Sequence, residues 1–228
     1  MFVYLNFYMR FIVLIAIVVG LSGCIGTKRY NRYLSEGYKK SADSLQSTNP
    51  DIIFRQNPSI IDTVSVATNK KSQFVPAIIF WQWEKSVSAT LAEKHQANKI
   101  QSYMARYADS LQLGDKLNGN KLQISIESAP ANFTYTNKGY FMYLFIAYVT
   151  AQQETIKPEF SDIKLSYTLV DNNNAVVKKG EITVLDTNVP ARNVWKSTKK
   201  FTWKYLDEYE RNVRLMSKQA IDKLSKEI

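Results

Sequence analysis

The sequence predicts an α+β fold, in which a single antiparallel sheet of about five or six strands carries two helices on one face. Several segments alternate apolar and polar residues with the period of a half-buried strand, and two others repeat apolar residues at helical spacing. The chain of 228 residues contains 14 Tyr, 11 Phe and 4 Trp, so it can bury one core of ordinary size. We expect a single domain over residues 59–228.

The first strands are expected between residues 60 and 91. A short strand over 61–67 and a polar turn over 68–72 precede a long strand that starts at Phe74. Odd-numbered positions from 77 to 91 are apolar, Lys85 excepted, and even-numbered positions from 82 to 90 are polar. One face of this long strand should therefore be buried.

Both helices are predicted from apolar stripes at the three-four spacing. Asn98 and Gln101 resemble a capping box, so the first helix is expected to begin there and to end at Gly114. The second helix is expected from about Thr202 to the last residue. The stripes consist of Ile100, Tyr103, Met104, Tyr107, Ala108 and Leu111, and of Leu206, Tyr209, Val213, Met216, Ala220, Leu224 and Ile228.

Two further strand patterns follow the first helix. Leu122, Ile124 and Ile126 alternate with polar residues and predict one strand. The segments 161–170 and 176–185 alternate in the same way on either side of a turn sequence, so they predict a hairpin, and Gly180 is a candidate bulge within it.

Residues 140–149, from Tyr140 to Val149, are apolar on both alternating faces. The run is too short to cross a membrane as a helix, which needs roughly 20 apolar residues. A strand with two apolar faces is expected at the centre of the sheet with a layer on each side. The helices would cover one face, and the N-terminal segment, another subunit or a ligand would cover the other.

The N-terminus has the parts of a secretory signal. A positive residue, Arg10, precedes an apolar run over 11–19 and small residues before Cys24. The motif Leu21-Ser22-Gly23-Cys24 resembles the lipobox of bacterial lipoproteins. That resemblance implies cleavage of residues 1–23, and attachment to a membrane through a diacylglyceryl group and an N-acyl chain on Cys24.

The length of the apolar run and the charge of the residues before it bear on how this segment is interpreted. An uncleaved transmembrane helix is the alternative, but the apolar run is short for one and is interrupted by Gly20, Ser22 and Gly23. Residues 1–8 carry no charge, whereas a signal peptide begins with a basic region. We therefore predict that translation begins at Met9.

Residues 24–58 are polar and are expected to form a lipidated tether ahead of the domain. A short amphipathic helix that lies on the membrane or on the domain is the alternative, because Tyr30, Tyr33, Leu34, Tyr38 and Leu45 are spaced as one helical face. Attraction to anionic lipids would use its basic side chains, and a solvated tether without a partner is equally compatible with them. These membrane-proximal basic residues are Lys28, Arg29, Arg32, Lys39 and Lys40.

Charge and residue inventory exclude several classes of function. The formal net charge is +10, and loss of Arg10 with the signal leaves +9; the charges are spread along the chain, and we expect no nucleic-acid partner. His95 is the only histidine and Cys24 the only cysteine, so the chain alone cannot build a zinc site or a histidine-based nucleophilic centre. Nucleotide-binding and hydrolase motifs are absent.

We expect no catalytic residues, metal or cofactor, and a hydrolase that uses paired carboxylates is the remaining enzymatic alternative. The predicted function is a non-catalytic binding or assembly module of the cell envelope, with an envelope protein as a candidate partner. A carrier of lipid or glycan is the alternative. Aromatic side chains on two strands are the candidate surface for ligand or partner, and Trp81 and Trp83 could equally be core anchors. The candidates are Trp81, Trp83, Tyr140, Tyr143 and Tyr148.

The predicted order of elements from about residue 75 to 228 is similar to that of small envelope lipoproteins. Examples are the lipoprotein of the lipopolysaccharide translocon and the auxiliary lipoproteins of lipid transporters. The similarity is one of topology, so it transfers no functional residue. It implies an envelope location, and Ile25 lacks the acidic character that retains enterobacterial lipoproteins at the inner membrane. The outer membrane, periplasmic side, is therefore expected.

Overall fold

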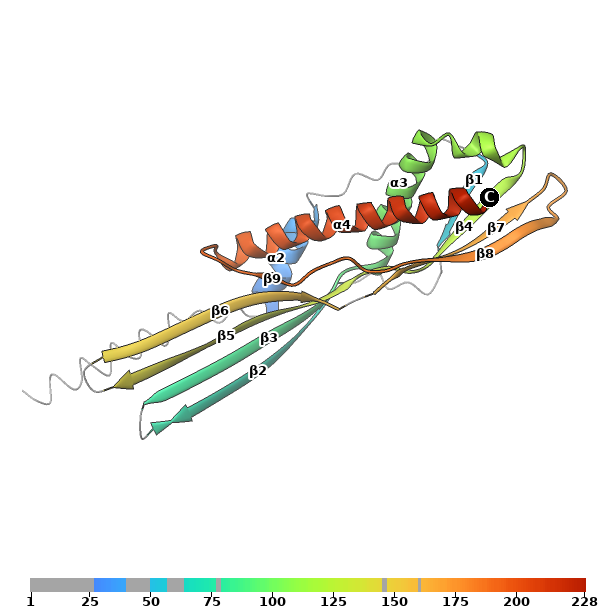
Figure 1. Cartoon of the computed structure of the whole chain (residues 1–228). Helices are drawn as coiled ribbons and strands as arrows, with labels where there is room; N and C mark the ends of the chain where they lie inside the picture. Colours follow the sequence, from blue (N-terminus) through green and yellow to red (C-terminus); the bar gives the residue numbers. More distant parts are fainter. Residues whose placement is uncertain (1–26, 40–49, 57–63, 77–78, 145–146, 160) are drawn as a thin grey trace, which may run out of the picture.

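The computed structural model describes residues 27–39, 50–56, 64–76, 79–144, 147–159 and 161–228. Within these ranges the fold is α+β, with three α-helices and two sheets of four and five strands (Figure 1). The α+β class is confirmed, but the prediction of a single sheet with two helices is wrong. Alternation of apolar and polar residues predicts which face of a strand is buried, but it does not predict which strand pairs with it. Here the chain passes from one sheet to the other several times, for example between β3 and β4.

The helices are α2 (Thr27–Lys39), α3 (Glu93–Ser110) and α4 (Thr198–Glu227), and a 3-10 helix, η2, spans Leu113–Leu117. In spatial order the four-stranded sheet contains β1 (Ile52–Gln56), β4 (Lys121–Ser128), β7 (Ile163–Val170) and β8 (Val176–Val184). The five-stranded sheet contains β2 (Ser65–Val75), β3 (Phe80–Thr90), β5 (Asn132–Leu144), β6 (Ala147–Pro158) and β9 (Ala191–Arg192).

The five-stranded sheet consists mainly of two long hairpins, β2–β3 and β5–β6, that lie side by side. The register pairs Phe80 of β3 with Met142 of β5 at one end and Thr90 with Asn132 at the other, so both hairpin turns lie at the same end of the sheet. Figure 1 shows this end reaching away from the helices. We call the described residues of 69–86 and 136–155 the arm.

Two predictions for the arm are wrong. The expected turn over 68–72 lies inside β2, because its polar side chains pair with β3 in an exposed part of the sheet where they remain hydrated. The single strand expected over 140–149 is divided: residues 140–144 end β5, which is the middle strand of its sheet as expected, and residues 147–149 begin β6. An apolar pattern on both faces does not distinguish a covered strand from an uncovered hairpin end.

Two parts of the predicted tether belong to the packed core. Tyr30 and Leu34 of α2 are fully buried, and the Tyr30 ring lies 4.9 Å from that of Tyr135 in β5. β1 pairs with β4 in parallel, with Ile52 opposite Leu122, so the four-stranded sheet is not wholly antiparallel. Every buried core residue in the described part of the chain lies between residues 30 and 224.

The remaining elements follow the sequence pattern closely. The hairpin β7–β8 is confirmed, and the Asp171 carboxylate accepts hydrogen bonds from the backbone N–H groups of its turn at 2.8 Å. Gly180 does not mark a bulge, because the register shifts elsewhere; a Cβ at Gly180 would lie 2.7 Å from the Tyr167 hydroxyl. α4 begins at Thr198, with Ser197 as the cap and the predicted stripe buried up to Leu224.

α3 begins earlier than its predicted capping box. Its N-cap is Ala92, and Asn98 lies inside the helix, where its carbonyl accepts a hydrogen bond from Ser102 at 2.9 Å. Ile100, Met104 and Ala108 form the buried stripe as expected. Among the described helices, none is both long and apolar enough to cross a membrane.

Leu34→Ala should lower the free energy of unfolding by about 2–5 kcal/mol, as truncation of a buried leucine does. The Leu34 side chain is fully buried between α2 and the rest of the core. Urea unfolding of residues 25–228, which include every described element, measures the change. Asn31→Ala on the exposed side of α2 is the matched control and should stay within about 0.5 kcal/mol of wild type. Equal effects of the two substitutions would mean that α2 is a tether.

Candidate functional site

The far end of the arm is apolar on both faces. Directly opposed residues of antiparallel strands point to the same face of the sheet, so the register assigns each side chain to a face. The face on which α2 lies carries Phe74, Trp81, Phe141, Tyr143 and Tyr148. The opposite face carries Val75, Phe80, Tyr140, Met142 and Val149. We call these ten residues the apolar end.

Several side chains of the apolar end face solvent. Tyr148 is 68% exposed and Phe74 59% exposed, and Ile79 in the turn between β2 and β3 is 44% exposed. Large apolar surfaces are uncommon on monomeric proteins, and where they occur they mark contacts with proteins, membranes or ligands. The apolar end is therefore the candidate functional site.

Trp81 and Trp83 are held in place on the arm, and they are not core anchors. Their ring centroids lie 5.1 Å apart. Trp81 Nε1 donates to Ser72 Oγ at 2.8 Å, and Trp83 Nε1 donates to Asn137 Oδ1 at 3.3 Å. Gly139 lies opposite Trp83, and a Cβ there would come within 2.4 Å of the indole ring, so only glycine lets the ring lie across β5.

The structure brings the predicted aromatic residues together at the same end of the arm. Trp81, Trp83, Tyr143 and Tyr148 share one face, and Tyr140 lies on the other, 6.3 Å from the Phe80 ring. Sequence reasoning missed Phe74 and Ile79 as surface residues. The signal was Pro76 between two apolar runs, which indicates a turn as readily as the start of a strand.

A band of charge follows the apolar end along the arm. Lys70 and Lys85 are opposed on the face of α2, where Lys70 is exposed and Lys85 is buried, and the exposed Lys71, Glu84 and Lys138 are opposed on the other face. We call these five residues the basic band; with four lysines and one glutamate it carries a net charge of +3. Trp83 and Tyr140 lie between the basic band and the outermost residues.

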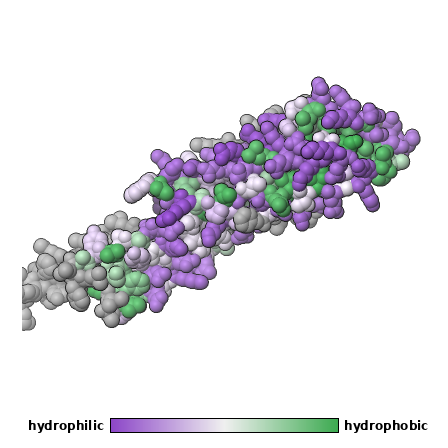
Figure 2. Space-filling model, viewed as in Figure 1, coloured by the Kyte–Doolittle hydropathy of each residue, from purple (hydrophilic) through white to green (hydrophobic). Residues whose placement is uncertain are grey.

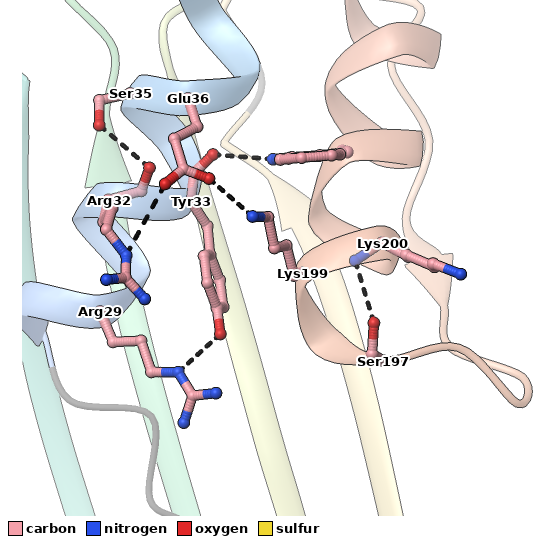
Figure 3. A network of polar contacts seen from close by, with 9 residues as sticks. Arg29, Arg32, Tyr33, Ser35, Glu36, Ser197, Lys199 and Lys200 are labelled. Atoms are coloured by element: carbon pink, nitrogen blue, oxygen red, sulfur yellow. Dashed lines mark hydrogen bonds and ion pairs between the residues drawn. The ribbon is translucent and has the colours of Figure 1, made fainter.

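α2 is fixed to the base of the arm and to α4. Thr27 Oγ1 lies 2.5 Å from Thr68 Oγ1 of β2. Figure 3 shows the contacts with α4, where Trp203 Nε1 donates to the Tyr33 carbonyl at 3.0 Å and Lys199 Nζ lies 2.8 Å from the Glu36 carboxylate. The hydrogen bond from Lys199 lowers the pKa of Glu36. The first residue of α2, three positions after Cys24, therefore has a defined place beside the arm.

The predicted membrane-proximal basic residues lie partly on α2. Lys28, Arg29 and Arg32 are exposed, and the Arg29 Nε donates to the Tyr33 hydroxyl at 2.6 Å (Figure 3). The side chain of Lys39, together with Lys40 and Cys24, lies outside the described residues.

Two hollows lie beside α3 and α4 in the described part of the chain. One of about 20 Å³ contains Tyr103, whose hydroxyl donates to Glu210 at 2.5 Å, and Lys99, 3.2 Å from the same carboxylate. Burial lowers the pKa of Lys99 and raises that of Tyr103 to about 12. The other hollow is open to solvent, and Arg214 and Lys218 in its wall lie over tyrosine rings. Neither hollow contains a residue of the arm.

Among the described residues, no group of three or more His, Cys, Asp and Glu side chains could hold a metal ion. Comparison of the chain with protein-family models, with curated proteins and with solved structures found no match.

Raised tyrosine pKa values predict a loss of stability at alkaline pH. Burial raises the pKa of Tyr30, Tyr135 and Tyr205, which lie between α2, α4 and the arm, and burial followed by a hydrogen bond to Glu227 raises that of Tyr167 to about 12. Unfolded tyrosines ionise near pH 10, whereas these folded ones stay neutral. Stability is thus complete below about pH 10 and falls progressively toward about pH 12.

Urea unfolding at a series of alkaline pH values measures this loss. Tyr167→Phe removes one of the raised pKa values, so its stability should fall less steeply with pH than that of wild type. Identical slopes would show that Tyr167 does not contribute.

Proposed function

We propose that the chain is a lipoprotein of the bacterial cell envelope, anchored through acylated Cys24, that presents the arm as a non-catalytic binding element. The observation that carries this proposal is the apolar end, exposed at the tip of two long hairpins whose base is fixed to α2. A surface of this kind is kept by a protein that uses it for contact.

The attachment of α2 supports a role in presentation. Thr27 follows Cys24 by three residues and lies against Thr68 at the base of the arm. An acyl anchor on Cys24 would therefore hold the arm close to the membrane. A long flexible tether would leave its distance and direction free, whereas α2 packs in the core through Tyr30 and Leu34.

A carrier of lipid or glycan has less support than a contact surface. The apolar side chains lie on the two outer faces of one sheet, so they form a projection, whereas small ligands bind mostly in concave sites. The hollows beside α3 and α4 contain no arm residue. The outer membrane, periplasmic side, remains the proposed location.

Cys24→Ala should abolish incorporation of labelled palmitate and release the protein from the membrane fraction of the cells that make it. The reason is that Cys24 is the only cysteine of the chain and so the only site for thioether acylation. Full-length wild type is the positive control, and Ser22→Ala, which keeps a small residue before the cut, should retain the label. Palmitate labelling of Cys24→Ala would rule out the anchor.

A photo-cross-linking residue in place of Tyr148 should capture an envelope component in cells that make the lipidated protein. Tyr148 is exposed at the far end of the arm. Leu185, which is 70% exposed after β8, is the matched control position and should give weaker products or none. Mass analysis distinguishes lipid from protein products. Equal yields of cross-linked product from the two positions would contradict the proposal that the arm is the binding element.

A further inference from the structure

We propose that the apolar end inserts shallowly into an anionic lipid leaflet, the same one that holds acylated Cys24, with the arm inclined to the membrane. This inference rests on the proposed function and names the partner of the same site. The partner is identified from the order of side chains along the arm, from the charge behind the apolar end and from the reach of the anchor.

The order of residue types along the arm matches the layers of a membrane surface. Figure 2 shows hydrophobic colours at the end of the arm and hydrophilic residues behind it. The exposed lysines of the basic band, Lys70, Lys71 and Lys138, come first, and Trp83 and Tyr140 follow. Phe74, Val75, Phe80 and Met142 come next, and Tyr143 and Tyr148 lie beyond them at the tip. Lysine at the phosphate level and Trp or Tyr at the interface are typical of proteins in contact with lipid.

The same order is present on both faces of the arm. A groove on a protein partner would contact one face of the arm, and the other face would then be expected to be polar. Here Trp81 and Phe141 point to one side while Phe80 and Met142 point to the other. A surface that surrounds the end on all sides, as a lipid leaflet does, satisfies both faces at once.

The tyrosines at the tip limit the depth of insertion. Tyr143 and Tyr148 are opposed in the last described pairs of β5 and β6, and a phenol hydroxyl is stable where it keeps water or headgroup partners. Interfacial segments enter about 5–10 Å into the headgroup and acyl boundary. The apolar end is therefore placed at this boundary and not in the centre of the bilayer.

The reach of the anchor sets the inclination. Along β2, Val75 lies seven residues beyond Thr68, which is about 23 Å at the rise of a strand. Cys24 precedes Thr27 by three residues, which span at most about 11 Å. If Cys24 and the apolar end enter one leaflet, the arm lies within roughly 30° of the membrane plane.

At this inclination Lys70 lies at the height of the lipid phosphates, and the aromatic side chains of the apolar end lie at the headgroup boundary. Lys70 lies five residues before Val75, so it stands about 8 Å above the tip, at the phosphate level for a shallow insertion. The face that carries α2 turns toward the membrane, which brings Phe74, Trp81 and Phe141 into contact. The exposed Lys28 and Arg29 of α2 lie on the same side.

Binding of the lipid-free chain to vesicles tests the proposal. Residues 25–228 contain every described helix and strand and all described core residues, and removal of the lipid leaves the arm as the source of affinity. Vesicles of phosphatidylglycerol with phosphatidylethanolamine should be bound, and neutral phosphatidylcholine vesicles should be bound at least about tenfold more weakly, because several lysines lose their anionic partners. Co-sedimentation gives the affinity. Tryptophan quenching by lipids brominated near the headgroup should exceed quenching by lipids brominated deep in the chain.

Two pairs of substitutions separate the apolar and the charged contributions. F74S/Y148S should lower the affinity for anionic vesicles by more than about tenfold, through loss of apolar burial, and V176S/L185S, with matched exposure on and after β8, should not. K70Q/K71Q, which includes the exposed lysine on the face turned toward the membrane, should lower binding to anionic vesicles only, and K116Q/K121Q, with the same change of charge away from the arm, should have little effect. All four positions of the tip and band variants are exposed, so thermal unfolding should confirm that each variant folds.

Three outcomes would overturn the proposal. The first is that wild type does not bind the anionic vesicles; the second is that the arm variants bind as well as their controls. The third is a dimer of wild type that F74S/Y148S abolishes while vesicle binding is absent, which would make a second copy of the chain the occupant. If vesicle binding fails but Tyr148 still captures an envelope protein in cells, this inference falls and the proposed function stands.

Discussion

The structure depends on the contact between α2 and the base of the arm, where the Tyr30 ring packs on Tyr135. The two long hairpins contribute buried residues to the core only near their base, and only on one face. α2 packs on that face. α4 in turn holds α2 through Trp203 and Lys199. Because this one aromatic layer joins an N-terminal helix, a C-terminal helix and the five-stranded sheet, the direction of the arm and the position of the chain that follows Cys24 are set together.

The arm combines a rigid construction with an exposed surface that other proteins avoid. Two-stranded hairpins are marginally stable alone, whereas here β3 and β5 pair over eleven residues and make one sheet of both hairpins. An open edge with apolar side chains invites pairing with other chains, and charged side chains on an edge strand oppose it. Lys70 and Lys71 on β2, an edge strand of this sheet, place charge on that edge.

The sequence predicts the parts of this fold in which one face is buried and the other wet. β4 and the β7–β8 hairpin follow from the alternation of apolar and polar residues, and the buried stripe of α4 follows from apolar residues at helical spacing. Trp81 and Trp83 lie on one face, as predicted. The surroundings of residues 140–149 could not be predicted, because a segment that is apolar on both faces has the same sequence pattern in a covered strand and in an exposed hairpin end. A short helix through Tyr30, Tyr33 and Leu34, lying on the membrane or on the domain, was only an alternative to the tether. The pattern could not decide its place, because the stripe is short and Trp203, which donates to the Tyr33 carbonyl, lies 170 residues away.

That separation in sequence has a consequence for the order of assembly. Contacts between distant segments form late, since the intervening chain must first be ordered. α2 is synthesised before the other described elements, yet it can dock fully only after α4, the last described helix, has been made and has folded against the sheets. β1 likewise waits for β4. The contact of α2 with the base of the arm is therefore among the last to form, and it waits for the C-terminal helix although α2 is near the start of the chain.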